Sequence, residues 1–113
     1  MDHERRRKPN IPREPLISEF AHDRDMVDLI EYFVGEMQTR VAYIERAWSD
    51  QDISKLREFA HQLKGAAAGY GFPQITDSAA ELEEGLDQEA AAADLAERVE
   101  ALIGMCRRAT TAP

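Results

Sequence analysis

The chain has 113 residues, which suits one domain with a single modest hydrophobic core. Hydrophobic residues make up 43% of the sequence and aromatic residues 7%; Ala, Leu, Glu and Asp are abundant and β-branched runs are missing, which predicts an all-α fold. The formal net charge is −8, and residues 16–113 hold 9 basic against 19 acidic side chains, an acidic body that argues against a nucleic-acid partner.

Residues 1–15 are polar, contain three prolines and show no periodicity, so we expect a flexible N-terminal arm. The run Arg5-Arg6-Arg7-Lys8 is too short to change that interpretation, and we expect it to be solvated. No stretch approaches the roughly 20 apolar residues of a membrane span, so no membrane partner is expected. No hydrophobic segment follows the basic run, so we expect a cytoplasmic protein. The single cysteine, Cys106, fits a buried residue in a reducing compartment.

The first predicted elements precede the central part of the chain. Residues 16–21 are expected to form a short apolar helix or turn that closes one end of the fold. Asp23 is suited to cap a following helix that runs to about Trp48, with acidic residues in its first turns. Apolar residues recur along that helix at steps of three and four, which predicts one long seam: Met26, Ile30, Phe33, Met37, Val41, Ile44 and Trp48.

A second helix follows a short polar connection at residues 49–52, which is tight enough to make it antiparallel to the first. Its apolar stripe has the same spacing: Ile53, Leu56, Ala60, Leu63, Ala67 and Tyr70. Two glycines, Gly69 and Gly71, lie close together where this helix should end, and they permit a left-handed cap.

Two further helices complete the predicted fold. Pro73 suits the first turn of the third helix, and Asp87 is expected to cap a fourth helix that runs to about Arg108. The third seam is Ile75, Ala79, Leu82 and Leu86, and the fourth is Ala92, Leu95, Val99, Leu102 and Cys106. Four amphipathic helices with short links predict an antiparallel up-down four-helix bundle over residues 16–108, with a tail at 109–113.

The second helix carries a separate face away from its apolar stripe. At about 100° per residue, this face gathers Arg57, His61, Lys64, Gly65 and Ala68. An imidazole there would face water, with a cation one turn away. Gly65 costs about 1 kcal/mol relative to Ala in mid-helix, which favours a role in close approach of a partner.

The run His61-Gln62-Leu63-Lys64-Gly65, followed by Gly71, resembles the H-x-L-K-G-x-x-x-x-x-G signature of histidine-containing phosphotransfer (HPt) domains. The resemblance extends over about residues 16–108. It implies that His61 is the phosphoacceptor, that Lys64 steadies the phosphoryl group and that Gly65 admits the partner. Arg57 and Ala68 would share the docking face. Members often carry Gln or Glu on the next helix near the imidazole, and Glu83 is the expected counterpart.

The resemblance also implies partners. A receiver domain would carry a phosphoaspartate and its Mg²⁺, so no cofactor is expected on this chain itself. The chain would be a monomeric phosphorelay intermediate that exchanges phosphate with response-regulator receivers, including those of a hybrid histidine kinase. It would not be a kinase, because nothing resembles a nucleotide-binding loop. One departure is the alanine run after Gly65, where relatives carry small polar residues, and it bears on partner choice.

Two alternatives stay open from the residues alone. Glu19/His22 and Glu58/His61 both have the Glu-x-x-His spacing of di-metal carboxylate bundles, but those ligands must point into the bundle. The other alternative is an adaptor bundle in which His61 has no chemical role, since a lone helical histidine is most often an ordinary surface or core residue.

Overall fold

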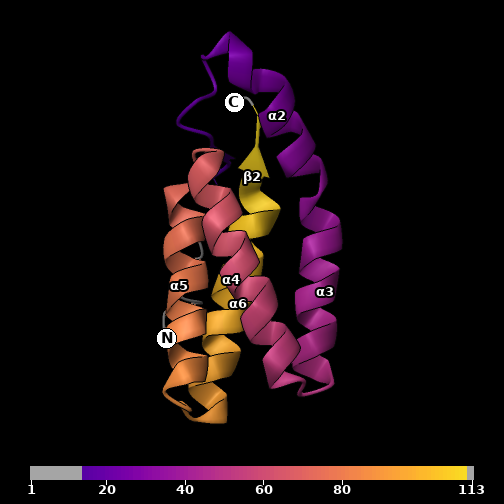
Figure 1. Cartoon of the computed structure of the whole chain (residues 1–113), viewed down its shortest axis with the longest axis vertical. Helices are drawn as coiled ribbons and strands as arrows, with labels where there is room; N and C mark the ends of the chain where they lie inside the picture. The colour runs from indigo at the N-terminus through magenta and orange to yellow at the C-terminus, as the bar shows by residue number, and fades with distance from the viewer. Residues whose placement is uncertain (1–13, 112–113) are drawn as a thin grey trace, which may run out of the picture.

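The computed structural model describes residues 14–111 and confirms an all-α bundle (Figure 1). The expected flexible arm at residues 1–15, with its basic run, lies outside this range except for Glu14 and Pro15. In chain order, the elements are β1 (Leu16–Ile17), α2 (Arg24–Gly35), α3 (Met37–Ser49), α4 (Ile53–Gly69), α5 (Pro73–Asp87), α6 (Ala92–Arg108) and β2 (Ala109–Thr110). None of the helices within residues 14–111 is long and apolar enough to span a membrane.

The first predicted helix is interrupted, which corrects the expectation of one helix up to Trp48. Asp23 caps α2 as expected, because its side chain accepts a hydrogen bond from the Asp25 backbone N–H. The helical run then breaks at Glu36, directly after Gly35, a residue that is costly in a helix interior. The apolar seam nevertheless continues across the break, since Phe33 and Met37 are both buried.

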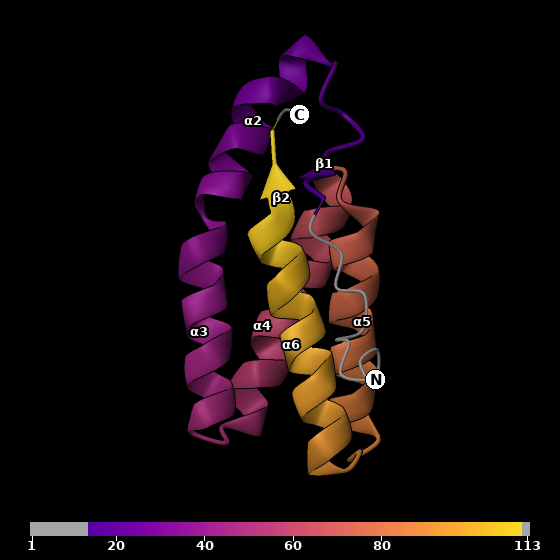
Figure 2. The ribbon, with the colours of Figure 1, turned by 180° about the vertical axis from the view of Figure 1, so that it is seen from behind.

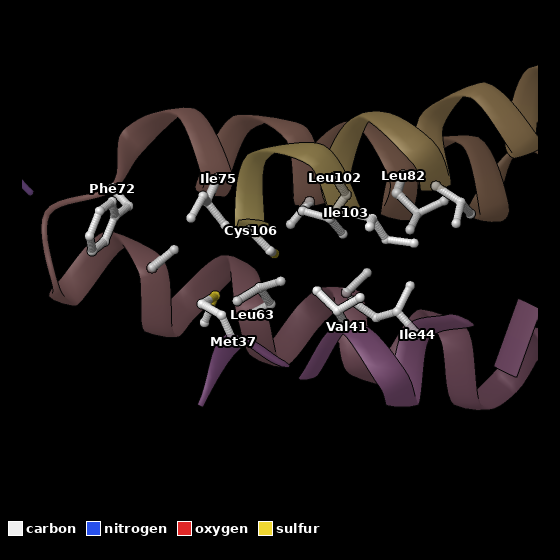
Figure 3. Packing of buried hydrophobic residues seen from close by; sticks show 14 of the residues in the cluster. Met37, Val41, Ile44, Leu63, Phe72, Ile75, Leu82, Leu102, Ile103 and Cys106 are labelled. Carbon is white, nitrogen blue, oxygen red and sulfur yellow. The ribbon is translucent and has the colours of Figure 1, made fainter. Parts of the chain in front are cut away.

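Helices α3, α4, α5 and α6 form a ring in which each contacts the next, and α6 closes back on α3. Figure 1 shows α4 on the near face between α5 and α3, and Figure 2 shows α6 on the opposite face. Side chains from all four helices meet in the centre, as Figure 3 shows. Fully buried members include Ile44, Leu56, Leu63, Ile75, Leu82, Leu102 and Cys106.

Phe33, on α2, packs against the turn between α4 and α5. Its ring stacks on Tyr70 with a centroid distance of 4.8 Å and on Phe72 at 5.6 Å. Phe33 and Phe72 are completely buried. Replacing a buried phenylalanine by alanine typically costs about 3–5 kcal/mol, so this stack is a main anchor of α2.

The ends of α5 and α6 partly match the expectations. Pro73 occupies the first turn of α5, as predicted. Asp87, however, is the last residue of α5, and the residue that precedes α6 is Ala91, whose side chain makes no cap hydrogen bond. Ala92 was expected to face inward but is exposed, because it lies in the first turn of α6 at the end of the bundle.

The segment before α2 also differs from the prediction. Instead of a short helix, residues 16–17 form β1, which pairs in parallel with β2 so that Leu16 lies opposite Ala109. The expected tail at residues 109–113 therefore begins as a strand. Buried Ser18 donates a 2.6 Å hydrogen bond to the Tyr70 carbonyl oxygen, and the Gly71 carbonyl accepts one from the Glu19 N–H. Turns at residues 19–22 lead into α2.

Candidate functional site

His61 lies in the middle of α4 on its solvent-facing side. The neighbouring positions Ala60 and Leu63 are buried in the core, so the helix is held with the imidazole outward. The side chain of His61 is 67% exposed. An imidazole so placed is accessible to a partner, as the helical projection predicted.

One nitrogen of this imidazole is bound by a carboxylate from α5. His61 Nδ1 lies 2.9 Å from Glu83 Oε2. An ionised carboxylate only accepts hydrogen bonds, so Nδ1 carries the proton and donates it to Glu83. A neutral imidazole with its proton on Nδ1 has its lone pair on Nε2. Within the described residues Nε2 has no hydrogen-bond partner, which leaves this nitrogen free as a nucleophile.

Lys64 binds the other oxygen of the same carboxylate. Its Nζ lies 2.7 Å from Glu83 Oε1, and the Glu83 side chain is only 17% exposed. The contact with Lys64, and to a lesser extent the bond with His61, hold the pKa of Glu83 below its usual value, although partial burial opposes this shift. Glu83 is therefore an anion at neutral pH, held at both oxygens between two residues of α4.

Further contacts fix α5 against this part of α4. Thr76 Oγ1 donates a 3.2 Å hydrogen bond to the Lys64 carbonyl oxygen. Arg57, expected on the docking face, donates through Nε to Asp87 Oδ1 at 2.8 Å. A second guanidinium nitrogen lies 3.4 Å from the Leu86 carbonyl at the end of α5. These contacts lie before and after Glu83 along α5, so they hold Glu83 opposite His61.

The surface beside His61 is low, as the sequence predicted. Gly65 is exposed, and a Cβ atom at this position would have open space around it. Ala68, one turn further, is also exposed and carries only a methyl group. By contrast, Gly71 has φ +84°, and a Cβ there would lie 2.6 Å from Ser18 Oγ. The two glycines of the motif thus have different roles: one leaves open space, and the other permits a tight turn.

The pairs considered for a di-metal site do not point into the bundle. Glu58 and His61 are both exposed on α4, and Glu19 and His22 are exposed in the turns before α2. Among residues 14–111, no three His, Cys, Asp or Glu side chains are placed together to hold a metal ion. Cys106 is buried in the core, where desolvation raises the pKa of its thiol to about 12.

Sequence reasoning did not predict two features near the site. The Arg57–Asp87 ion pair joins residues 30 positions apart, and no local pattern indicates it. A groove between α3 and α4 is also new, although its aromatic wall includes Tyr43, a large residue next to a predicted seam position. In the sequence, bulky side chains beside an apolar seam could have indicated such a surface.

Fold and site together define a small helical bundle that presents a histidine in the middle of α4 to solvent and holds it through a carboxylate on the next helix. The family model described as Hpt domain matches residues 28–112, so the chain belongs to the Hpt domain family. Hpt domains carry phosphoryl groups on a histidine in two-component phosphorelays and interact with receiver domains. Neither a curated protein nor a solved structure matched the chain.

Proposed function

We propose that this chain is a phosphorelay intermediate that accepts a phosphoryl group from a receiver-domain aspartate on His61 and passes it to another receiver. The observation that carries the proposal is the 2.9 Å bond between His61 Nδ1 and Glu83, with the imidazole 67% exposed. This bond leaves the lone pair of Nε2 available to a partner that docks on α4. His61 is the phosphoacceptor, and Glu83 orients and polarises its ring.

The reaction follows from these positions. Nε2 attacks the phosphorus in line as the bond between phosphorus and the aspartyl oxygen breaks, and the electron pair of that bond leaves with the carboxylate. The ring becomes a phosphorylated imidazolium that keeps its Nδ1 proton, which donates to the anionic Glu83. Such transfer has a loose transition state, so positioning and neutralisation of charge carry most of the rate. The reverse sequence passes the group to a second receiver.

Lys64 supplies the remaining charge from this chain. Its Nζ is bound to Glu83 in the resting state, one helical turn from His61. A phosphoryl group on Nε2 gives the ammonium a second anionic partner on the same side of α4. Lys64 therefore steadies the phosphorylated state, while the metal ion and most catalytic groups belong to the receiver.

The docking face in this proposal is the exposed side of α4 around Gly65 and Ala68, two positions that carry nothing larger than a methyl group. Arg57 lies at its edge and is engaged with Asp87. The chain acts as a cytoplasmic monomer, is not an enzyme with its own turnover, and receives phosphate from receivers that include those of hybrid histidine kinases.

The test is direct transfer. Receiver domains from the source organism are charged with labelled acetyl phosphate, repurified and mixed with the chain. At least one receiver is expected to pass label to the wild-type chain, as an acid-labile, base-stable phosphate. Failure of every receiver, with label remaining on the receivers, would support the adaptor alternative instead.

A further inference from the structure

The two sides of His61 differ in what they offer a partner. On the α5 side, the charged groups already bind each other: Glu83 with Lys64, and Arg57 with Asp87. On the α3 side, a cavity of about 400 Å³ opens between α3 and α4. Figure 1 shows these two helices side by side on the face that carries α4. We call this cavity the aromatic groove; its wall includes Thr39, Arg40, Tyr43, Phe59, Gln62 and Leu63.

The groove has the chemistry of a contact surface. Tyr43 and Phe59 stack on each other in its wall with ring centroids 5.5 Å apart, and Tyr43 remains 55% exposed. Gln62 and Thr39 are exposed at the groove and make no side-chain hydrogen bond within residues 14–111. Arg40 is bound to Glu36, but its Nε is buried without a partner among the described residues. An aromatic wall with unused polar groups at its rim is typical of the centre of an interface.

The position of the groove identifies its occupant. A specific interface covers about 800 Å² of each partner, which is a disc of about 16 Å radius. Gln62 directly follows His61, and a helix with its side chains is only about 10–12 Å wide. A receiver that places its phosphoaspartate over His61 must therefore also cover the flanks of α4. Both flanks have a cavity, but the one on the α3 flank is lined by aromatic rings, whereas the one on the α5 flank is lined by charged side chains, of which Glu83 and Lys64 already bind each other.

We propose that the aromatic groove is the main docking anchor for the receiver that exchanges phosphate with His61, and that an apolar side chain of that receiver packs against the stacked rings of Tyr43 and Phe59. This inference rests on the proposed function and names the surface that selects its partner. Gly65 and Ala68 let the receiver lie flat across α4, and the α5 side forms the polar rim.

Two substitutions test the groove without touching the site. Tyr43→Ala removes one aromatic wall, and Thr39→Arg places a long cation at the groove from an exposed helical position. Arg is also a better helix former than Thr, so Thr39→Arg should remain folded even if Tyr43→Ala is destabilised. Leu29→Ala is the matched control, because Leu29 is a comparably exposed apolar residue, at 49%, that does not line the groove.

Each variant is phosphorylated in two ways: with phosphoramidate, which reaches the imidazole without docking, and with the charged receiver that labels the wild-type chain. We expect wild-type labelling by phosphoramidate in all three variants. Transfer from the receiver should fall at least tenfold in kcat/KM for Tyr43→Ala and Thr39→Arg, chiefly through KM, and stay unchanged for Leu29→Ala.

The outcomes that would contradict this inference can be distinguished from those that would contradict the proposed function. Wild-type transfer by both groove variants would overturn the groove as anchor while leaving His61 as phosphoacceptor. No transfer from any receiver to the wild-type chain would overturn the proposed function and this inference with it. If sedimentation shows that the wild-type chain dimerises and the groove variants do not, the occupant is a second copy of the chain, which would overturn the receiver assignment.

Discussion

Glu83 Oε2 lies 2.9 Å from His61 Nδ1, across the contact between α5 and α4. The same carboxylate is bound by Lys64 through its other oxygen, so it has little freedom to rotate away from the ring. This geometry fixes the imidazole proton on Nδ1 and presents Nε2 to solvent. The chemistry proposed for the chain depends on this pair.

Replacing Glu83 by glutamine should separate orientation from charge. The amide oxygen of Glu83→Gln still accepts from Nδ1, but the positive charge of the phosphorylated ring loses its counter-ion. We expect roughly hundredfold slower transfer onto His61, the lower end of what a positioned acid–base group contributes, whereas transfer off the phosphorylated ring should not slow, because loss of the counter-ion destabilises its starting state. Rapid-quench kinetics with a charged receiver measures this. Rates equal to wild type would show that the charge of Glu83 is not used.

The pH dependence of stability offers a second test of Glu83. Its folded-state pKa is lowered, so its contribution to the free energy of unfolding is present above the ordinary glutamate pKa of about 4.3 and is lost as the pH falls through the lower folded value. Urea unfolding of wild type and Glu83→Gln should therefore differ at pH 7, and the difference should shrink as the pH falls below the ordinary glutamate pKa of about 4.3. A difference that is constant over this range would contradict the ion pair with Lys64.

Lys64→Ala is expected to leave the bundle folded, because the side chain is 35% exposed and lies outside the core. Without its ammonium, the phosphoryl group on His61 loses a nearby cation, and Glu83 loses one of its two contacts. Transfer should slow or the phosphohistidine lifetime should shorten. Following label on purified phosphorylated protein over time gives both quantities. If neither changes, this charge is dispensable.

Gly65 tests the docking geometry apart from the chemistry. A Cβ at this position meets open space, and glycine is the poorest helix former after proline, so Gly65→Gln should keep or raise the melting temperature. The added side chain stands one turn from His61 on the face that the receiver covers. Transfer from a receiver should therefore fall steeply while phosphoramidate labelling persists. Full receiver transfer in a stable variant would place the receiver elsewhere.

Gly71 provides the contrasting control for that experiment. Its φ is +84°, and a Cβ would lie 2.6 Å from Ser18 Oγ. Gly71→Ala should therefore lower stability by about 1–3 kcal/mol, because it combines a disfavoured backbone conformation with a steric clash. A melting temperature equal to wild type would mean that the segment at Ser18 is not packed on this turn.

Much of the fold follows from the sequence because seams with steps of three and four residues dominate it. The buried residues of α4 are the predicted ones, and Gly71 has the left-handed conformation expected after that helix. The break at Glu36 was missed because the apolar periodicity runs through it and only the hydrogen-bond pattern changes. The β1–β2 pair was missed because strands of two residues carry no periodicity.

For the candidate site, too, some features could be predicted from the sequence and others could not. Helical projection places His61, Gly65 and Ala68 on one exposed face, since these positions depend only on residues within one helix. The contacts of Glu83 with His61 and Lys64, 22 and 19 positions away, depend on how α5 is rotated against α4. The Arg57–Asp87 pair and the aromatic groove depend on inter-helix packing as well, and a sequence pattern does not specify that packing.

The central claim is that phosphate is carried on Nε2 of His61. The most direct measurement is ¹H–¹⁵N NMR of the imidazole nitrogens, before and after charging by a receiver, in wild type and in His61→Gln, which should fold normally because the ring is largely exposed. We expect the proton of unphosphorylated His61 on Nδ1, then phosphorus coupled to Nε2, and no phosphohistidine signal in the variant. Undiminished labelling of His61→Gln, or phosphorus on Nδ1 in the wild type, would contradict the account.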